Sequence, residues 1–242
     1  MDFLKNKNLI FRRTLSFNCS YLPKKMEKRL YINIPKSTDN QNLVSELTKN
    51  GFRRSFDHMY IPICDSCNMC IPSRINIKKF KLSKSNKRNL KINQDLIFKL
   101  DSGKTNNERY ELFKEYCNTR HNDSQMAHMN KDEFESFFYN KFNKTNIYDV
   151  FDSSNSLIGS ILMDIFIDGY SAIYSFFKPQ FKKRGLGKYL IIRSILELKV
   201  QNIPYLYLGF WVKNSKKMDY KVNFNNTELL VNGKWEEKTK FF

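Results

Sequence analysis

The chain has 242 residues, of which 41% are hydrophobic and 15% aromatic, so it can bury a core and wholesale disorder is excluded. No apolar run approaches the roughly 20 residues that cross a bilayer, and the N-terminus lacks the apolar stretch of a signal peptide, so we expect a cytoplasmic protein with no membrane partner. Lys and Arg number 42 against 24 Asp and Glu, and the net charge of +18 favours a polyanionic partner such as nucleic acid. A codon bias toward A and T would also add lysines, without creating a binding surface.

The first hundred residues are predicted to alternate short strands with helices. Alternating apolar residues indicate the strands, and apolar residues at helical spacing indicate the first helix, which ends at Gly51; a basic stretch is expected to form the second helix. The second helix places Lys84, Lys87 and Arg88 along one face, where they are candidate phosphate contacts. We predict strands at residues 28–35, 58–63 and 74–82, and helices at residues 40–51 and 83–93.

A different pattern begins near residue 106. Two amphipathic helices are followed by three strand-like runs with short turns between them, which indicates an antiparallel meander. The strongest helix comes next, and Pro204 separates it from a buried strand. We predict helices at residues 106–121, 131–142 and 184–202, and strands at residues 146–152, 156–168, 170–177 and 205–212.

This order of elements predicts an α+β fold with two domains. Residues 1–100 are expected to form a cysteine-bearing α/β domain. Residues 101–242 are expected to form a second domain with a mainly antiparallel central sheet. The boundary is placed around residues 95–105, where a polar stretch separates the two patterns.

Cysteines cluster in residues 60–74, "YIPICDSCNMCIPSR". The C-x2-C-x2-C spacing brings three thiolates toward one zinc ion or one iron–sulfur cluster, with a fourth cysteine or His58 completing the set. The alternative is that these cysteines pack as small apolar residues. A disulfide framework is not expected, because the cysteine count of five is odd and no secretory signal precedes it. The predicted metal ligands are Cys19, Cys64, Cys67 and Cys70.

A basic, glycine-rich turn lies in residues 177–191, "FKPQFKKRGLGKYLI", between a predicted strand and a predicted helix. Backbone N–H groups at a helix N-terminus bind anions, and Lys182, Lys183 and Arg184 add positive charge there. The Arg-Gly-Leu-Gly pattern resembles the pyrophosphate loop of GNAT acetyltransferases. Backbone permissiveness alone also explains glycine at a turn.

Positive charge and aromatic rings interleave after the last predicted strand. Lys217, Tyr220 and Lys221 suit the end of a nucleic acid, where bases stack on rings and phosphates meet cations. An ordinary surface loop is the alternative.

Segments along almost the whole chain resemble one family. They are CSYLP (19–23), GFRRS (51–55), the cysteine segment (60–74), SKSNKR (83–88), RHND (120–123), DGYSAIY (168–174), RGLG (184–187), PYLYLGFW (204–211) and KMDYK (217–221). Together they resemble the bacterial aminoacyl-tRNA–protein transferases, specifically the aspartate/glutamate leucyltransferase group related to eukaryotic arginyltransferases, over residues 19–235. Two positions depart from the family pattern: Gly185 stands where serine is usual, and Lys24 stands where glycine is usual. A tight turn with positive φ at Lys24 would therefore be strained.

The resemblance implies an N-terminal cysteine-bearing domain and a GNAT-like C-terminal domain. It also implies transfer of leucine from leucyl-tRNA to the N-terminal α-amine of proteins that begin with Asp or Glu, which marks them for proteolysis by the N-degron route. No cofactor is required for transfer, because the aminoacyl ester is already activated. The alternatives are an arginyl-tRNA donor, a GNAT acetyltransferase that uses acetyl-CoA at residues 182–188, and an RNA-binding module stabilised by zinc.

Four residues are candidates for handling the acceptor in that reaction. Arg74 and Arg120 suit its acidic side chain, since a guanidinium fork matches a carboxylate. His121 is the candidate for taking the proton of the amine, and Asp168 for orienting the amine. Ion pairs within the fold, a structural histidine and a turn-forming aspartate would also explain these four residues.

Overall fold

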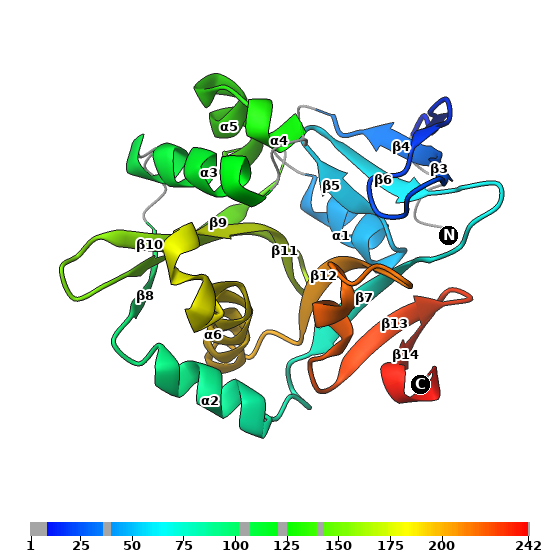
Figure 1. Cartoon of the computed structure of the whole chain (residues 1–242). Coiled ribbons are helices and arrows are strands. Elements are labelled where there is room, and N and C mark those ends of the chain that lie inside the picture. Colours follow the sequence, from blue (N-terminus) through cyan, green and yellow to red (C-terminus); the bar gives the residue numbers. More distant parts are fainter. Residues whose placement is uncertain (1–8, 36–39, 102–106, 121–124, 140–142, 242) are drawn as a thin grey trace.

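The computed structural model describes residues 9–35, 40–101, 107–120, 125–139 and 143–241 (Figure 1). The α-helices are α1 (Gln41–Lys49), α2 (Lys84–Ile92), α3 (Asn107–Arg120), α4 (Gln125–His128), α5 (Lys131–Phe138) and α6 (Leu186–Val200). The short 3-10 helices are η2 (Pro179–Arg184), η3 (Asp219–Val222) and η4 (Lys238–Lys240).

The strands form two larger sheets and one two-stranded ribbon. The four-stranded sheet has the order β1-β4-β6-β5, and the ribbon pairs β2 with β3. These strands are β1 (Arg12–Arg13), β2 (Phe17–Asn18), β3 (Met26–Glu27), β4 (Arg29–Asn33), β5 (Arg53–Ser55) and β6 (His58–Pro62).

The central sheet has eight strands in the order β14-β13-β7-β12-β11-β10-β9-β8. In Figure 1, α3 and α5 lie on one side of its β9–β11 half and α6 lies on the other. Its strands are β7 (Cys70–Asn76), β8 (Ile97–Leu100), β9 (Thr145–Phe151), β10 (Leu157–Ile165), β11 (Gly169–Phe177), β12 (Tyr205–Val212), β13 (Thr227–Val231) and β14 (Lys234–Glu237).

A core rich in phenylalanine fills the space between α3, α5 and the sheet. Phe134 and Phe138 stack at 4.2 Å between ring centroids, because the i, i+4 spacing puts them on one face of α5. Phe113 of α3 and Phe176 of β11 meet edge-on at 5.6 Å. The Asn130–Glu133 capping box fixes where α5 begins.

The N-terminal sheet and α1 form a smaller unit with its own apolar cluster. Leu43, Val44 and Leu47 are each 1% exposed and pack against Ile32 and Met59 of the four-stranded sheet. Their i, i+1, i+4 spacing supplies the apolar stripe that was predicted for this helix.

The predicted meander is confirmed. β10 pairs antiparallel with both β9 and β11, and among the described strands the one parallel pairing joins β11 to β12. The predicted α+β class with a mainly antiparallel sheet is therefore confirmed.

The central sheet takes strands from both halves of the chain. β7, which begins at Cys70, lies between β12 and β13. β8 forms one edge of the sheet, and β14 forms the other. The sheet thus crosses the predicted boundary between residues 1–100 and 101–242, and that division stays a prediction.

Three local expectations had different outcomes. The strand predicted at residues 74–82 is wrong beyond Asn76, because the Asn76 side chain accepts a hydrogen bond from the Lys79 N–H and closes a turn. The β13–β14 hairpin was missed. At Lys24, φ is +61°, so this position has positive φ although it is not glycine. No helix in the described ranges has both the length and the apolar character needed to span a membrane.

Candidate active site

Strands β11 and β12 separate in the middle of the central sheet. They pair only where Gly169–Ser171 meets Tyr205–Tyr207. Farther along, β11 continues to Phe177 beside β10, and β12 continues to Val212 beside β7. The two facing edges no longer bond each other, so their carbonyl groups need donors from elsewhere.

Arg53 of β5 supplies donors to both edges. Its Nη1 donates to the Leu208 carbonyl at 3.2 Å, and its Nη2 donates to the Ile173 and Ala172 carbonyls at 2.8 and 3.5 Å. Gly209 makes this insertion possible: its φ is +73°, and a Cβ atom there would lie 1.5 Å from Arg53 Nη1. The Arg53 guanidinium therefore bridges the two strands where the sheet opens.

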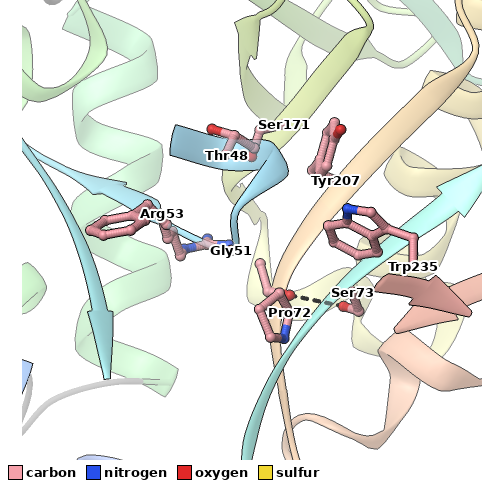
Figure 2. Close-up of a pocket in the computed structure, with 10 residues that line it drawn as sticks. Thr48, Gly51, Arg53, Pro72, Ser73, Ser171, Tyr207 and Trp235 are labelled. Atoms are coloured by element: carbon pink, nitrogen blue, oxygen red, sulfur yellow. Dashed lines mark hydrogen bonds between the residues drawn. The ribbon is translucent and has the colours of Figure 1, made fainter. Parts of the chain in front are cut away.

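A narrow recess lies beside Arg53 (Figure 2). Its volume is about 10 Å³, roughly the room that one water molecule needs. The recess lies between the small N-terminal unit and the central sheet, because residues of both line it. Residues that line it include Thr48, Gly51, Arg53, Ser171, Tyr207 and Trp235.

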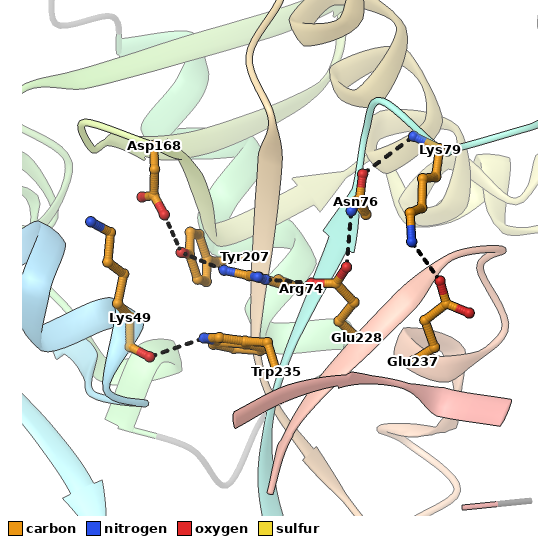
Figure 3. Close-up of polar contacts among 9 residues, drawn as sticks. All are labelled: Lys49, Arg74, Asn76, Lys79, Asp168, Tyr207, Glu228, Trp235 and Glu237. Carbon is orange, nitrogen blue, oxygen red and sulfur yellow. Dashed lines mark hydrogen bonds and ion pairs between the residues drawn. The ribbon is translucent and has the colours of Figure 1, made fainter. Parts of the chain in front are cut away.

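Arg74, a predicted acceptor-binding residue, is buried in an aromatic and acidic setting (Figure 3). Its Nε donates to Glu228 Oε2 at 2.8 Å, and its guanidinium carbon lies 3.6 Å from the Tyr205 ring centroid and 4.4 Å from that of Trp235. Glu228 thus already occupies the fork that was predicted to receive the acceptor carboxylate. An incoming acid would have to compete with it.

Asp168, the predicted orienting group, belongs to the same network (Figure 3). The Tyr207 hydroxyl donates to Asp168 Oδ2 at 2.8 Å and accepts from Arg74 Nη1 at 3.2 Å. Burial, followed by the charge of Asp168, raises the pKa of Tyr207, so its hydroxyl stays protonated. Asp168 Oδ1 is buried and has no hydrogen-bond partner among the described residues. The structure brings Asp168 and Arg74 together, through Tyr207.

Arg120 is the last residue of α3. Arg120 is exposed, and its guanidinium carbon lies 5.7 Å from the Phe177 ring centroid. His121 lies outside the described residues.

The two basic segments that were predicted to bind nucleic acid lie next to each other. The amides of Asn89 in α2 and of Asn93, which follows α2, donate to the Arg184 carbonyl at 3.1 and 3.0 Å, and Lys188 donates to Ser85 Oγ at 2.8 Å. These bonds dock α2 against the start of α6 (Figure 1). The exposed cations of this basic surface are Lys84, Lys87, Arg88, Lys182 and Lys183.

Arg184, also predicted to bind tRNA, is held by the fold. Its guanidinium donates to Asn93 Oδ1 at 3.0 Å and pairs with Asp95. The hydrogen bond from Arg184 lowers the pKa of Asp95. Arg184, the last residue of η2, therefore links η2 to the segment that follows α2.

The predicted cations near η3 have different surroundings. Lys217 is exposed and Tyr220 is 45% exposed, as expected for contacts with RNA. Lys221 is only 4% exposed, and its Nζ donates to the Phe210 carbonyl at 2.7 Å. Burial, followed by the positive charge of Arg53, lowers the pKa of Lys221 well below its ordinary value. Lys221 thus lies inside the protein rather than on the RNA-facing surface that was predicted for it.

The cysteine segment brings its thiols into one neighbourhood. Burial, then Glu27, then the thiols of Cys19, Cys64 and Cys67 raise the pKa of Cys70 to about 12. All described cysteines are free thiols. Within the described ranges, no three Cys, His, Asp or Glu side chains are grouped closely enough to hold a metal ion. Zinc or iron–sulfur binding stays a prediction.

Sequence reasoning missed Arg53, Glu228 and Trp235. The signal for Arg53 was the GFRRS segment, in which two arginines follow a glycine, together with Gly209 in a buried strand. The partners are too far apart for periodicity to connect them, since Arg74 and Glu228 are 154 positions apart.

Solved structures first indicate the fold class. The crystal structure of FemX has a TM-score of 0.52 with 9% identity, and the match covers 91% of this chain and 86% of that chain. At this level of identity the match shows similarity of fold alone, and it agrees with the predicted α+β class.

Sequence comparisons then identify the family. Residues 17–88 match the N-terminus, and residues 108–231 the C-terminus, of the arginine-tRNA-protein transferase family. Aspartate/glutamate leucyltransferase of Saccharophagus degradans is 38% identical over 90% of this chain and 92% of its own length. The protein of the same name from Hahella chejuensis is 36% identical over 95% of this chain and 97% of its own length. The chain belongs to the arginine-tRNA-protein transferase family, which confirms the resemblance found in its sequence.

Proposed function

We propose that this protein transfers leucine from leucyl-tRNA to the N-terminal α-amine of proteins that begin with Asp or Glu. The observation that carries the proposal is the near full-length similarity to relatives named aspartate/glutamate leucyltransferase. We further propose that the reaction takes place in the cytoplasm and marks its products for proteolysis.

The chemistry asks little of the protein beyond positioning. The ester of an aminoacyl-tRNA is activated, and an α-amine with a pKa of about 7.7–8.0 is partly neutral at cytoplasmic pH. The amine attacks the ester carbonyl, the C–N bond forms as the C–O bond to the tRNA ribose breaks, and the amine proton goes to the leaving hydroxyl. Holding amine and ester within about 3–3.5 Å supplies much of the rate enhancement, so no cofactor is needed.

Charged tRNA is proposed to lie along the exposed cations. The surface formed by α2 and η2 supports this, because two segments far apart in sequence add their charges there. Lys217 and Tyr220 lie near the end of β12 and are proposed to meet the acceptor end of the tRNA, where a ring can stack on a base.

The acceptor amine is proposed to meet Asp168. Its buried Oδ1 atom, which has no partner among the described residues, is a suitable acceptor for an ammonium or amine N–H group. His121 is the proposed proton acceptor, and Arg120 remains a candidate for the acidic side chain.

Cys19, Cys64, Cys67 and Cys70 are proposed to hold a structural zinc ion or an iron–sulfur cluster. Support comes from the C-x2-C-x2-C spacing of Cys64, Cys67 and Cys70. Bound there, the group would fix the hairpin of Cys19 against the start of β7. Iron and zinc analysis of anaerobically purified protein tests this proposal.

The decisive experiment supplies leucyl-tRNA, arginyl-tRNA and acetyl-CoA separately, each with a peptide that begins with Asp. We expect labelled leucine on the peptide. Labelled arginine instead would establish the arginyl-tRNA alternative. An acetylated peptide, with no amino acid transferred, would refute aminoacyl transfer.

A further inference from the structure

Two basic side chains bind alternate backbone carbonyl groups of β12. Arg53 binds the Leu208 carbonyl, and Lys221 binds the Phe210 carbonyl. Alternate carbonyls of a strand lie on one edge about 7 Å apart, so the two side chains are neighbours along the edge that faces away from β7.

This pair differs from the other buried cations of the chain. Arg54, Arg74 and Arg109 are each less than 10% exposed, and each pairs with a carboxylate: Asp164, Glu228 and Asp149, respectively. Buried charges are costly unless they are paired, and these three follow that rule.

Arg53 and Lys221 have only backbone carbonyls as hydrogen-bond partners in the described part of the chain, and no carboxylate there lies within ion-pair distance of either. The lowered pKa of Lys221 is the electrostatic result, since burial and Arg53 both disfavour its charged form. An anion placed between the two groups would favour the protonated amine again. The site therefore lacks one negative charge.

We propose that Arg53 and Lys221 form the pocket for the side-chain carboxylate of the acceptor's N-terminal Asp or Glu. This inference rests on the proposed function and names the residues that would give it its specificity. The acidic side chain of the acceptor would then bind Arg53, which has no acidic partner among the described residues. It would not bind Arg74, which already pairs with Glu228.

A carboxylate fits this position better than an RNA phosphate does. The recess beside Arg53, whose lining does not include Lys221, has room for about one water, so a phosphodiester flanked by two riboses does not fit there. Arg53 Nη1 donates to one carbonyl and keeps a second N–H group, so this group and the Lys221 ammonium can each donate to one oxygen of a carboxylate. The amide of Asn or Gln would turn an N–H group toward these donors, so the pocket distinguishes acids from their amides.

The experiment measures leucine transfer from leucyl-tRNA to peptides that differ only in starting with Asp or Asn. Wild-type protein, Lys221→Met and Arg53→Lys are compared with Lys238→Met. Lys238 is the matched control, because it also binds backbone carbonyls, but those of Val222 and Phe224 rather than a carbonyl of β12. Thermal unfolding identifies any variant that must be assayed at lower temperature.

We expect the ratio of kcat/KM for Asp over Asn peptides to fall at least tenfold in Lys221→Met and in Arg53→Lys, mainly through KM for the Asp peptide. Lys238→Met should keep the wild-type ratio. Fluorescence anisotropy of a labelled Asp peptide, without tRNA, should show the same loss of affinity in the first two variants. Unchanged kcat/KM ratios and unchanged peptide affinity in both Lys221→Met and Arg53→Lys would refute the proposed carboxylate pocket. A wild-type protein that transfers leucine to neither peptide would instead refute the proposed function.

Discussion

Arg53 and Arg54 are consecutive residues of one short strand, yet they enter two different environments. Strand geometry sends their side chains to opposite faces. Arg54 pairs with Asp164 of β10 at 2.7 Å, and both side chains are 1% exposed. Arg53 bridges the carbonyls of β11 and β12 and has no acidic partner in the described ranges. Arg54 is therefore paired with an acidic side chain, whereas Arg53 remains able to bind an acidic ligand.

The comparison separates anchoring from recognition. Arg54 also donates to the Phe137 carbonyl at 3.0 Å, so it ties the small N-terminal unit to both the sheet and α5. With that anchor in place, Arg53 is held at the opening of the sheet. Stability and specificity can therefore be tested at adjacent positions.

The largest expected effect on stability comes from breaking the buried ion pair between Arg54 and Asp164. Arg54→Met leaves the Asp164 carboxylate buried without its cation and should lower the free energy of unfolding by about 3–5 kcal/mol. Burial already raises the pKa of Asp164, and Arg54 opposes that rise. Urea denaturation measures the change. Replacing both partners, in Arg54→Met with Asp164→Leu, should recover part of the loss; a change below about 1 kcal/mol in the single variant would contradict the anchoring role.

A smaller effect is expected from adding a methyl group beside the Arg53 guanidinium. Gly209→Ala would place a Cβ atom 1.5 Å from Arg53 Nη1 and push the guanidinium away. We expect a loss of about 1–3 kcal/mol in stability, with a roughly tenfold drop in transfer to an Asp peptide. Gly233→Ala is the control, since φ there is +75° and no atom lies within 4 Å of the added Cβ. If both variants retain full transfer, the position of Arg53 is not important for function.

The pH dependence of stability tests whether Lys221 is an uncompensated charge. Its pKa is lowered on folding, so between that lowered pKa and about 10.4 the unfolded chain binds more protons, and stability rises with pH. The slope from this group is at most about 1.4 kcal/mol per pH unit. Lys221→Met should remove that contribution, as measured by urea midpoints at pH 7 and pH 9.5. Parallel pH profiles for the two proteins would show that Lys221 carries no such penalty.

The smallest effect is expected from fully solvated charge. Replacing both Lys182 and Lys183 with Ala should leave stability within about 0.5 kcal/mol and weaken tRNA binding severalfold. For every phosphate that a lysine no longer neutralises, the slope of log affinity against log salt should become shallower by about 0.7–0.9. Affinity measured at several salt concentrations provides the test. An unchanged slope would remove these lysines from the RNA surface.

Much of the architecture could be predicted from local sequence pattern. Periodicity located α1, the meander, α6 and β12, because each buries an apolar face or an apolar run, whereas α2, which buries Asn86 and Asn89, was predicted from a basic stretch. It could not show that β7 lies between β12 and β13, since that depends on pairing between distant segments. The candidate site was harder still. Lys221 occurs in a basic, polar stretch that is typical of a surface, and only the fold shows that it turns inward to Phe210.

The position of β7 also has a consequence for biosynthesis. Ser73 of this strand bonds to Gly209, 136 positions later, so β7 leaves the ribosome long before either neighbour in the sheet exists. Pairing over such distances slows folding, because a long loop must close before any pairing energy is gained. The nascent N-terminal half would therefore wait, with a strand edge unpaired, and a chaperone that shields this edge should raise the yield of native protein.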